Sequence, residues 1–370
     1  MRSSSILYLG GDSGTSRHRA LALRRLGHEV LIVEPERFLP DGRFSRIWSW
    51  QTGGLFFENR VRRKLLAGLP KTHFDLVFVD SGDLLGPSVV RELNERYGTI
   101  VNYNIDDPYG ERDGQHWRLY RAAVPFYHLI VVVRDCNVDE AFAAGARDVL
   151  RVHRSADEIA HAPRSMRTED FHKWGSEVSF IGTWMPERGP FMTRLLALGV
   201  PLSIYGDRWQ KAPEWPALRA AWRGGSVYEE DYARAIQCAK VNLGLLSKEN
   251  RDTVTTRSFE IPHLGGVFCA QRTDEHTELY KEGEEAVFWS SPEECAAKCM
   301  ELLGDETRRM RLAMNGRNRC LKNNTTNEAV LLQILCGVLN PERAQVNSLA
   351  EPKRGNSLFT AAAAIEGQGI

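Results

Sequence analysis

The stretch that decides the fold is residues 252–266, DTVTTRSFEIPHLGG. It begins with polar residues, turns apolar at Phe259, breaks at Pro262, and closes with Gly265 and Gly266 before the apolar run 267–270. This pattern predicts a loop, the start of a helix, a turn and a strand. Backbone N–H groups at the start of a helix bind anions with little reorganisation. We therefore expect an anionic ligand at this loop.

The side chains of the same stretch suit a sugar nucleotide. Arg257 and the helix N–H groups can bind a diphosphate, and the carboxylates of Asp252 and Glu260, separated by seven residues, can accept hydrogen bonds from ribose hydroxyls. The expected donor-binding residues of this stretch are Asp252, Thr255, Thr256, Arg257, Glu260 and Gly265. A plainer interpretation is that Glu260 only caps a helix and that the glycines only form a turn.

The run TTRSFEIPHLGGVFCA resembles the donor-site signature of GT-B glycosyltransferases. It is most similar to the CgeB-like (spore maturation protein type) group, which reads T-x-R-x-F-E-I-P-x-x-G-G; Asp252 stands where the wider superfamily has a first Glu. The matching residues are Thr255, Arg257, Phe259, Glu260, Ile261, Pro262, Gly265 and Gly266. The resemblance, which spans residues 6–339, implies an α/β protein with two Rossmann-like parallel-sheet domains that face a cleft, and a C-terminal crossover helix.

Composition narrows the class of protein. A chain of 370 residues is long enough for two domains, and its 48 basic and 48 acidic side chains create no overall field that would attract nucleic acid. Its seven cysteines are scattered and form no C-x-x-C pair, which disfavours a disulfide framework and a zinc site. No apolar run reaches the length needed to span a bilayer. We expect a cytoplasmic protein that uses no cofactor and no metal.

The first half alternates apolar runs with segments of helical periodicity, which predicts a parallel sheet covered on both faces. Its first unit reads strand, glycine-rich loop, helix and strand over residues 5–33. In GT-B enzymes this loop lies in the cleft, so the resemblance makes Gly10, Gly11, Arg17 and His18 candidates for acceptor binding. His18 could equally be an ordinary histidine on a helix surface.

Polar clusters follow two of the expected strands, at residues 80–83 and 102–109. The second contains Asp106-Asp107-Pro108, which is similar to an Asp-Asp-Pro at this strand end in the CgeB-like group. Pro108 disfavours helical geometry at Asp107, so the two carboxylates should point to opposite sides and one should face the cleft. We expect that one to be Asp107, with a pKa raised by its neighbour, as the group that takes the acceptor proton. The alternative is a structural turn.

Residues 44–69 interrupt the alternation. Trp48, Trp50 and a further aromatic cluster lead into apolar residues at helical spacing, with basic residues between them. Such a segment can lie on an anionic membrane surface, and it can equally be an ordinary packed helix. Peripheral membrane contact through residues 48–66 is therefore one possibility.

The second half restarts the strand pattern after a polar linker at residues 153–176. We expect an acceptor domain at residues 1–165, a donor domain at 166–325, a crossover helix at 326–340 and a tail at 341–370. The loops that follow the first two strands of the donor domain add five expected donor contacts: Gly182, Thr183, Arg188, Tyr205 and Gly206.

Together these features predict a glycosyltransferase of the hexosyltransferase class. It would move a sugar from a nucleotide-sugar to a hydroxyl of a saccharide, lipid-linked or other small-molecule acceptor, without a metal and with retention of configuration. Asp107, Asp106 and Arg257 are the expected catalytic residues. Two alternatives remain open, a nucleotide-sugar epimerase and a non-catalytic nucleotide-sugar-binding or scaffold protein.

Overall fold

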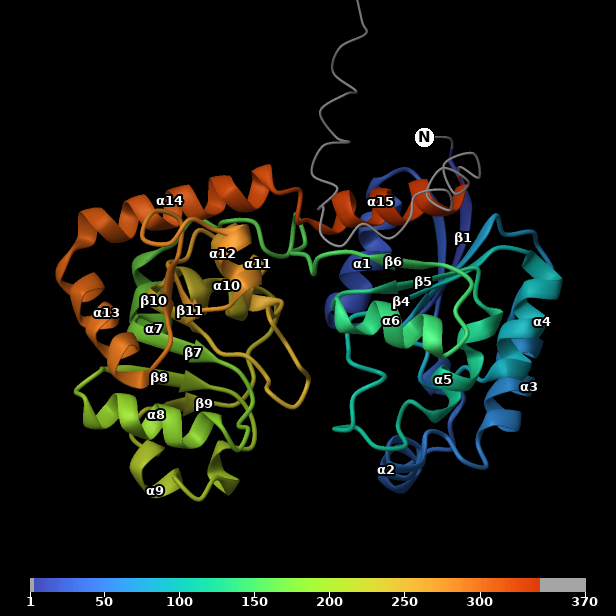
Figure 1. Cartoon of the computed structure of the whole chain (residues 1–370), viewed down its shortest axis with the longest axis horizontal. Helices are drawn as coiled ribbons and strands as arrows, with labels where there is room; N and C mark the ends of the chain where they lie inside the picture. The colour runs from blue at the N-terminus through green and yellow to red at the C-terminus, as the bar shows by residue number, and fades with distance from the viewer. Residues whose placement is uncertain (1–2, 340–370) are drawn as a thin grey trace, which may run out of the picture.

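A computed structural model describes residues 3–339 and contains two six-stranded parallel sheets (Figure 1). The first sheet has the order β2-β1-β3-β4-β5-β6. Its inner strands β3, β4 and β5 are buried along their whole length, as the continuous apolar runs predict. The strands are β1 Ser5–Leu9, β2 Glu29–Val33, β3 Leu76–Asp80, β4 Ile100–Asn104, β5 Leu129–Val132 and β6 Val149–Arg151.

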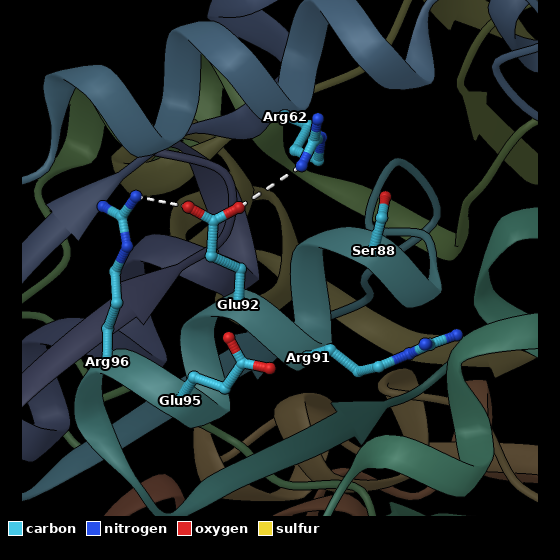
Figure 2. Close-up of a pocket in the computed structure, with 6 residues that line it drawn as sticks. All are labelled: Arg62, Ser88, Arg91, Glu92, Glu95 and Arg96. Atoms are coloured by element: carbon cyan, nitrogen blue, oxygen red, sulfur yellow. Dashed lines mark hydrogen bonds and ion pairs between the residues drawn. The ribbon is translucent and has the colours of Figure 1, made fainter.

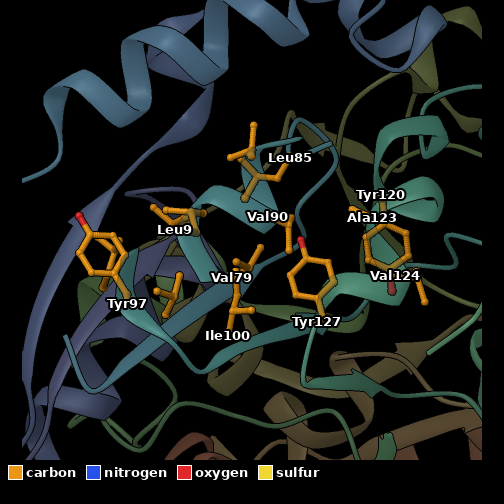
Figure 3. Close-up of a cluster of buried hydrophobic side chains, with 14 of the residues drawn as sticks. Leu9, Val79, Leu85, Val90, Tyr97, Ile100, Tyr120, Ala123, Val124 and Tyr127 are labelled. Carbon is orange, nitrogen blue, oxygen red and sulfur yellow. The ribbon is translucent and has the colours of Figure 1, made fainter. Parts of the chain in front are cut away.

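Helices connect these strands and supply the rest of the first core. Figure 3 shows part of it, where Leu9 and Val79 of the sheet pack with Val90 and Tyr97 of α4 and with Tyr127. The helical segments are α1 Gly14–Arg25, η1 Pro35–Phe38, α2 Arg43–Thr52, α3 Glu58–Gly68, α4 Pro87–Tyr97, α5 Arg118–Ala123, η2 Val124–Phe126 and α6 Cys136–Ala143.

The second sheet has the order β12-β11-β10-β7-β8-β9. Its strands are β7 Ser176–Ile181, β8 Leu202–Tyr205, β9 Trp222–Gly224, β10 Ala239–Gly244, β11 Phe268–Gln271 and β12 Val287–Trp289. The sequence did not predict β9, because three residues are too few to show a period. The helical segments are α7 Thr168–Trp174, α8 Arg188–Ala197, η3 Trp209–Lys211, α9 Trp215–Leu218, α10 Glu229–Gln237, α11 Arg257–His263, α12 Asp274–Leu279, α13 Pro292–Gly304 and α14 Glu306–Lys322.

The last described helix, α15 Asn327–Leu339, returns to the first sheet (Figure 1). Val330, Leu331 and Ile334 of α15 share a buried cluster with Ile6 and Tyr8 of β1, so this helix is part of the N-terminal core. The expected crossover is confirmed. The linker at residues 153–176 lacks a complete strand, as expected, but contains the short helix α7. The expected tail at 341–370 lies outside the described residues.

The aromatic segment at residues 44–69 forms two helices instead of one. Val61, Leu65 and Leu66 of α3 are buried, so this part is the ordinary packed helix that the sequence allowed. The helix before it, α2, buries only Ser49.

Each sheet has one point where the direction of strand addition reverses. In the first sheet it lies between β1 and β3, and in the second between β7 and β10. In open parallel sheets, ligands bind beyond the carboxyl ends of the strands at such points. The topology therefore directs attention to the loops that follow these four strands.

Candidate functional site

The loops after β7 and β10 meet at the N-terminus of α8. Arg188, the first residue of α8, donates hydrogen bonds to the carbonyls of Thr183 (2.8 Å), Leu245 (3.4 Å) and Leu246 (3.3 Å). Its guanidinium also lies over the ring of Phe180, 5.5 Å from the centroid. One arginine therefore joins the strand ends on both sides of the reversal point.

The charge of Arg188 is not balanced inside the protein. The residue is 7% exposed, its Nε has no hydrogen-bond partner, and no carboxylate within residues 3–339 forms an ion pair with it. Burial lowers the pKa of Arg188 to about 10, against the opposing effect of the nearby charge of Glu187. A buried cation without an anion is costly, so an anionic ligand that reaches this place would gain a strong partner.

A second cation, partly buried, lies at the start of α11. Arg257 is the first residue of this helix; it donates to Glu260 (2.8 Å) and to the hydroxyl of Thr256 (3.2 Å), while its Nε has no partner. The guanidinium lies over the ring of Tyr232, 4.9 Å from the centroid. The charge of Arg257 also acts on Arg188 and adds to the lowering of its pKa that burial causes.

Glu260 lies behind Arg257 and is 2% exposed. Its Oε2 accepts hydrogen bonds from Tyr232 (2.7 Å) and Arg257, and its Oε1 lies 3.5 Å from Nε2 of His161. Burial alone would raise the pKa of Glu260, but Arg257 and His161 outweigh it and hold the pKa below its usual range. In this state Glu260 orients Arg257, and the expected contact with a ribose remains a prediction.

Asp252 does not face the same space as Glu260. Its Oδ1 accepts hydrogen bonds from Arg134 and from Arg154 (2.8 Å), and its side chain is 4% exposed. Arg134 directly follows β5 and its Nε also donates to the carbonyl of Asn250. The expectation that Asp252 lines the donor loop is therefore corrected: this carboxylate joins the β10–α11 loop to the N-terminal domain.

The two aspartates before Pro108 point to different surroundings, as expected. The member that is accessible and has the raised pKa is Asp106, however, and not Asp107. Asp107 is 3% exposed and accepts hydrogen bonds from Arg251 at both oxygens (2.7 Å each) and from Asn137 (2.9 Å). Burial alone would raise the pKa of Asp107, but these donors hold it below its usual range. Asp107 therefore lacks the raised pKa that was expected for a proton acceptor.

Asp106 is the exposed member of the pair. Solvent reaches its side chain, yet the surrounding protein removes enough water to raise the pKa of Asp106, even though Arg154 and Arg134 act in the opposite direction. The main-chain carbonyl of Asp106 accepts a hydrogen bond from Arg134 (2.8 Å), which fixes the turn. The accessible carboxylate with a raised pKa is thus Asp106.

The glycine-rich loop after β1 gives mixed results. A side chain at Gly10 would meet Ser16, Tyr8 and Asp80 at 2.8–2.9 Å, so this glycine permits close packing at the strand end. Gly11 is partly exposed, and Arg17 lies on the surface near Asp12 (3.9 Å). These positions carry no feature that points to a ligand.

His18 is half-buried and faces the second domain. Its ring meets that of His161 edge-on, with centroids 5.8 Å apart, and its Nδ1 is buried without a partner. Burial lowers the pKa of His18, so the imidazole is neutral at pH 7. His18, His161 and Glu260 therefore form a line of polar side chains from the first domain to the second.

Other expected donor contacts have structural roles. Tyr205 is 5% exposed and its ring lies 5.7 Å from that of Trp174, so the expectation that it touches the ligand is corrected. A side chain at Gly206 would meet the carbonyl of Gly182 at 2.1 Å, because the two strand-end loops touch there. Gly265, with φ of +79°, follows the end of α11. The main-chain N–H of Thr255 donates to the hydroxyl of Ser258 (3.1 Å), and the expected contact of its side chain with the donor stays a prediction.

Sequence reasoning missed four residues that join the two domains, namely Arg134, Arg154, Arg251 and His161, and it missed Tyr232, which binds Glu260 within the second domain. Arg134 follows β5 almost directly, and a cation at the carboxyl end of a parallel strand was a usable signal. The partners of Arg251 and Arg154 are more than 90 positions away in the sequence, so no local pattern could have shown them.

Three cysteines form the one group within residues 3–339 whose side chains could together hold a metal ion. The Sγ atoms of Cys269 on β11 and of Cys295 and Cys299 on α13 lie within 4.8 Å of one another and are buried. The sequence disfavoured such a group, because it contains no C-x-x-C pair. The fold nevertheless brings a strand cysteine next to two helix cysteines that are far from it in the sequence. They belong to a hydrophobic core and not to the site around Arg188.

A pocket of about 500 Å³ lies elsewhere, on α3 and α4 (Figure 2). Glu92 projects into it and pairs with Arg62 (3.4 Å) and with Arg96. Because these charges are exposed and satisfy one another, the pocket carries no argument for a ligand.

Comparison with known proteins agrees with this geometry. Residues 188–335, which include Arg188 and all of α11, match a family model described as glycosyl transferase-like. Among curated proteins, none matches the sequence.

Solved structures share the whole architecture at low sequence identity. Sucrose-phosphate synthase from Thermosynechococcus elongatus is similar with a TM-score of 0.64 and 13% identity over 94% of this chain and 100% of that one. HepE from Anabaena, in complex with UDP-glucose, has a TM-score of 0.62 and 13% identity over 94% of this chain and 100% of that one. A putative UDP-N-acetylglucosamine 2-epimerase from Listeria monocytogenes gives 0.56 and 8% over 96% and 100%. The expected GT-B fold is confirmed.

Proposed function

We propose that this protein is a glycosyltransferase that binds a nucleotide-sugar at the reversal point of its second sheet. The observation that carries the proposal is the buried guanidinium of Arg188, which has no carboxylate partner among residues 3–339 and whose Nε is free there. A diphosphate supplies the missing negative charge and accepts from a planar guanidinium in two places. The match of residues 188–335 to the glycosyl transferase-like model supports the same assignment.

Charge stabilisation explains how this site would promote transfer. The bond between the anomeric carbon and the diphosphate oxygen breaks, and its electron pair stays on the diphosphate. The acceptor oxygen forms the new bond to carbon on the face that the diphosphate leaves, as retention requires, and the acceptor proton passes to Asp106. Negative charge on the leaving group grows along this path, and Arg188 and Arg257 are already in place to meet it. Groups that are aligned before the reaction contribute most to such catalysis.

The acceptor side of the proposal rests on Asp106. The acceptor hydroxyl must lose a proton as its oxygen attacks, and Asp106 is an accessible carboxylate whose pKa is raised. A base works best when its pKa approaches the working pH. We assign proton acceptance to Asp106 and give Asp107 the structural task of holding Arg251.

The proposal includes retention of configuration and independence of a metal. Retention is supported by the resemblance of the 252–266 stretch to signatures that occur mainly in retaining enzymes. Metal independence is supported by the two arginines, which supply the positive charge that a divalent ion would otherwise provide. UDP-glucose is the first donor to test, because HepE, a structure of the same fold, is known in complex with it.

A product assay tests the proposal and separates it from the alternatives. The protein is incubated with a panel of nucleotide-sugars and with pools of saccharide and lipid-linked acceptors, with and without EDTA. We expect release of the nucleoside diphosphate that depends on acceptor and persists in EDTA, with a retained anomeric centre by NMR. Conversion of the sugar without acceptor would identify an epimerase, and tight binding of donor without turnover would identify a binding protein.

A further inference from the structure

The helix α2 and the turn after it expose an unusual amount of apolar surface. Phe44 is 89% exposed and Phe56 80%, and the chain between residues 43 and 56 also exposes Ile47, Trp48, Trp50 and Leu55. Soluble surfaces rarely carry large apolar side chains in such a short contiguous segment. We call residues 43–56 the α2 patch.

The α2 patch is held in place by the protein, so its exposure is a built feature. Arg118 donates hydrogen bonds to the carbonyls of Thr52 (3.3 Å) and Gly53 (3.2 Å). A side chain at Gly53 would meet the carbonyl of Gln115 at 2.2 Å, which shows how closely the backbone is seated. The underside of α2 is therefore used for docking, and its aromatic side chains are left outside.

The charge of the α2 patch is positive. Arg43 and Arg46 are exposed and form no ion pair within the described part of the chain, and there is no acidic residue from 42 to 57. Asp41 precedes the patch and Glu58 follows it, and Arg46 lies close enough to Glu36 to act on the pKa of that carboxyl. Exposed aromatic rings beside unpaired arginines complement an apolar layer covered by anionic groups.

We propose that the α2 patch docks on the surface of a lipid bilayer that contains anionic lipids. Tryptophan and phenylalanine rings would enter the boundary between head groups and acyl chains, while Arg43 and Arg46 would meet lipid phosphates. No helix within residues 3–339 is long and apolar enough to cross a membrane, so the contact is peripheral. The patch lies at the edge of the N-terminal domain opposite to α15 (Figure 1).

The position of the α2 patch suggests what kind of molecule carries the acceptor hydroxyl, an argument that rests on the proposed function. The ring of Trp50 stacks on His116 (5.4 Å between centroids), and His116 lies 3.9 Å from Asp83 at the end of β3. Asp83 is also close enough to Asp106 for the charge of Asp106 to act on it, which places the patch on the same side of the domain as the proposed base. A docked protein would hold its proposed acceptor side against the bilayer, which fits an acceptor hydroxyl carried by a membrane lipid.

Vesicle flotation tests the docking without any donor or acceptor, so it can fail independently of the proposed function. The full chain is mixed with vesicles of phosphatidylcholine alone or with added phosphatidylglycerol. We expect strong binding only to the anionic vesicles. The double variant Phe44→Ser/Phe56→Asn should lower the partition coefficient at least about tenfold, because it removes the two most exposed rings. Asparagine suits position 56, where φ is +69°.

Matched variants separate a specific surface from general stickiness. Phe142→Ser/Phe171→Ser removes two other exposed rings (49% and 53%) and should leave binding unchanged. Arg43→Gln/Arg46→Gln should weaken binding to anionic vesicles by about fivefold per arginine, whereas Arg219→Gln/Arg311→Gln should not. The proposal is overturned if the wild type ignores anionic vesicles, if both phenylalanine pairs matter equally, or if the protein is a dimer that Phe44→Ser/Phe56→Asn converts to a monomer.

Discussion

Asp106 and Asp107 occupy different surroundings although they are adjacent in the chain. Asp107 accepts from Arg251 and Asn137 and is buried, whereas Asp106 is exposed and its pKa is raised. The sequence could predict that the two carboxylates point to opposite sides, because Pro108 restricts the turn. It could not predict which side is which, because the deciding partner, Arg251, is 144 positions away.

These surroundings predict different effects for the variants Asp106→Asn and Asp107→Asn. Asp106→Asn should remove most transfer to acceptor and leave donor affinity unchanged, because it removes the proposed base without touching the arginine site. Asp107→Asn should lower the free energy of unfolding by roughly 1.5–3 kcal/mol, since it breaks charge-assisted hydrogen bonds. Steady-state kinetics and thermal unfolding of both variants check this. Wild-type turnover by Asp106→Asn would show that the proton leaves by another route.

Arg188 illustrates what a sequence can show about a single residue. A strand, a glycine and an arginine that opens a helix predicted a contact with an anion, and the structure brings that arginine to the reversal point of the sheet. Its lack of a carboxylate partner could not be predicted, because that depends on every side chain around it. The burial of Tyr205 could not be predicted either, because its ring packs against Trp174, which lies far from it in the sequence.

At the scale of elements, α11 shows how the chain accommodates a proline inside a helix. Pro262 has no N–H to donate to the carbonyl of Ser258 one turn earlier, and the sequence therefore predicted that the helix ends there. In the structure the helix continues to His263, and the hydroxyl of Tyr280 donates to the Ser258 carbonyl instead (2.7 Å). A side chain 18 positions later thus replaces the missing bond, which no local signal could reveal.

This substitution of one donor for another can be measured by a double-mutant cycle. Tyr280→Phe should cost roughly 1–3 kcal/mol of unfolding free energy, because it leaves a buried carbonyl without a donor. Pro262→Ala restores a backbone N–H that can reach the same carbonyl. In the Pro262→Ala background Tyr280→Phe should therefore cost less. Denaturant unfolding of the four proteins gives the coupling, and equal costs in both backgrounds would mean that the hydroxyl bond adds nothing.

For the whole molecule, the succession of strands and helices along the chain was largely predictable, and the contacts between the domains were not. Continuous apolar runs that alternate with helical segments were enough to predict two parallel sheets. The domains are joined by ion pairs such as Arg134–Asp252, Arg251–Asp107 and Arg151–Glu275, whose members lie far apart in the sequence. The exposure of α2 could not be predicted from the sequence either, because the same apolar residues could have been buried.

Glu275 makes the junction between the domains sensitive to acid. It accepts from Arg151, from His153 (3.1 Å) and from Thr253. Burial alone would raise the pKa of Glu275, but these partners lower it from 4.5 to about 2. Because the folded pKa lies below the unfolded one, the stabilisation is complete above pH 4.5 and is lost as the pH falls towards 2.

Glu275→Gln should therefore be less stable than the wild type at pH 7, by roughly 2–3 kcal/mol, and the difference should shrink as the pH falls below the unfolded pKa. Glu278→Gln, on the exposed side of the same helix, serves as the matched control and should show no such difference. Thermal unfolding midpoints across the acid range check this. A difference that stays constant with pH would show that the carboxylate charge is not what holds the junction.

The central claim is that a nucleotide-sugar diphosphate completes the charge of Arg188, and calorimetric titration of UDP-glucose tests it most directly. Arg188→Met should weaken donor binding by about tenfold to a hundredfold, the loss expected for hydrogen bonds to a charged group. In the free protein the variant loses the hydrogen bonds of Arg188 to three carbonyls but also removes a buried charge that has no carboxylate partner among residues 3–339, so its unfolding midpoint is measured alongside to show that it is folded. Arg194 is an exposed arginine of the same helix α8 and pairs with Glu293 of α13, so Arg194→Met should bind UDP-glucose as the wild type does. Unchanged affinity in a well-folded Arg188→Met protein would contradict the account.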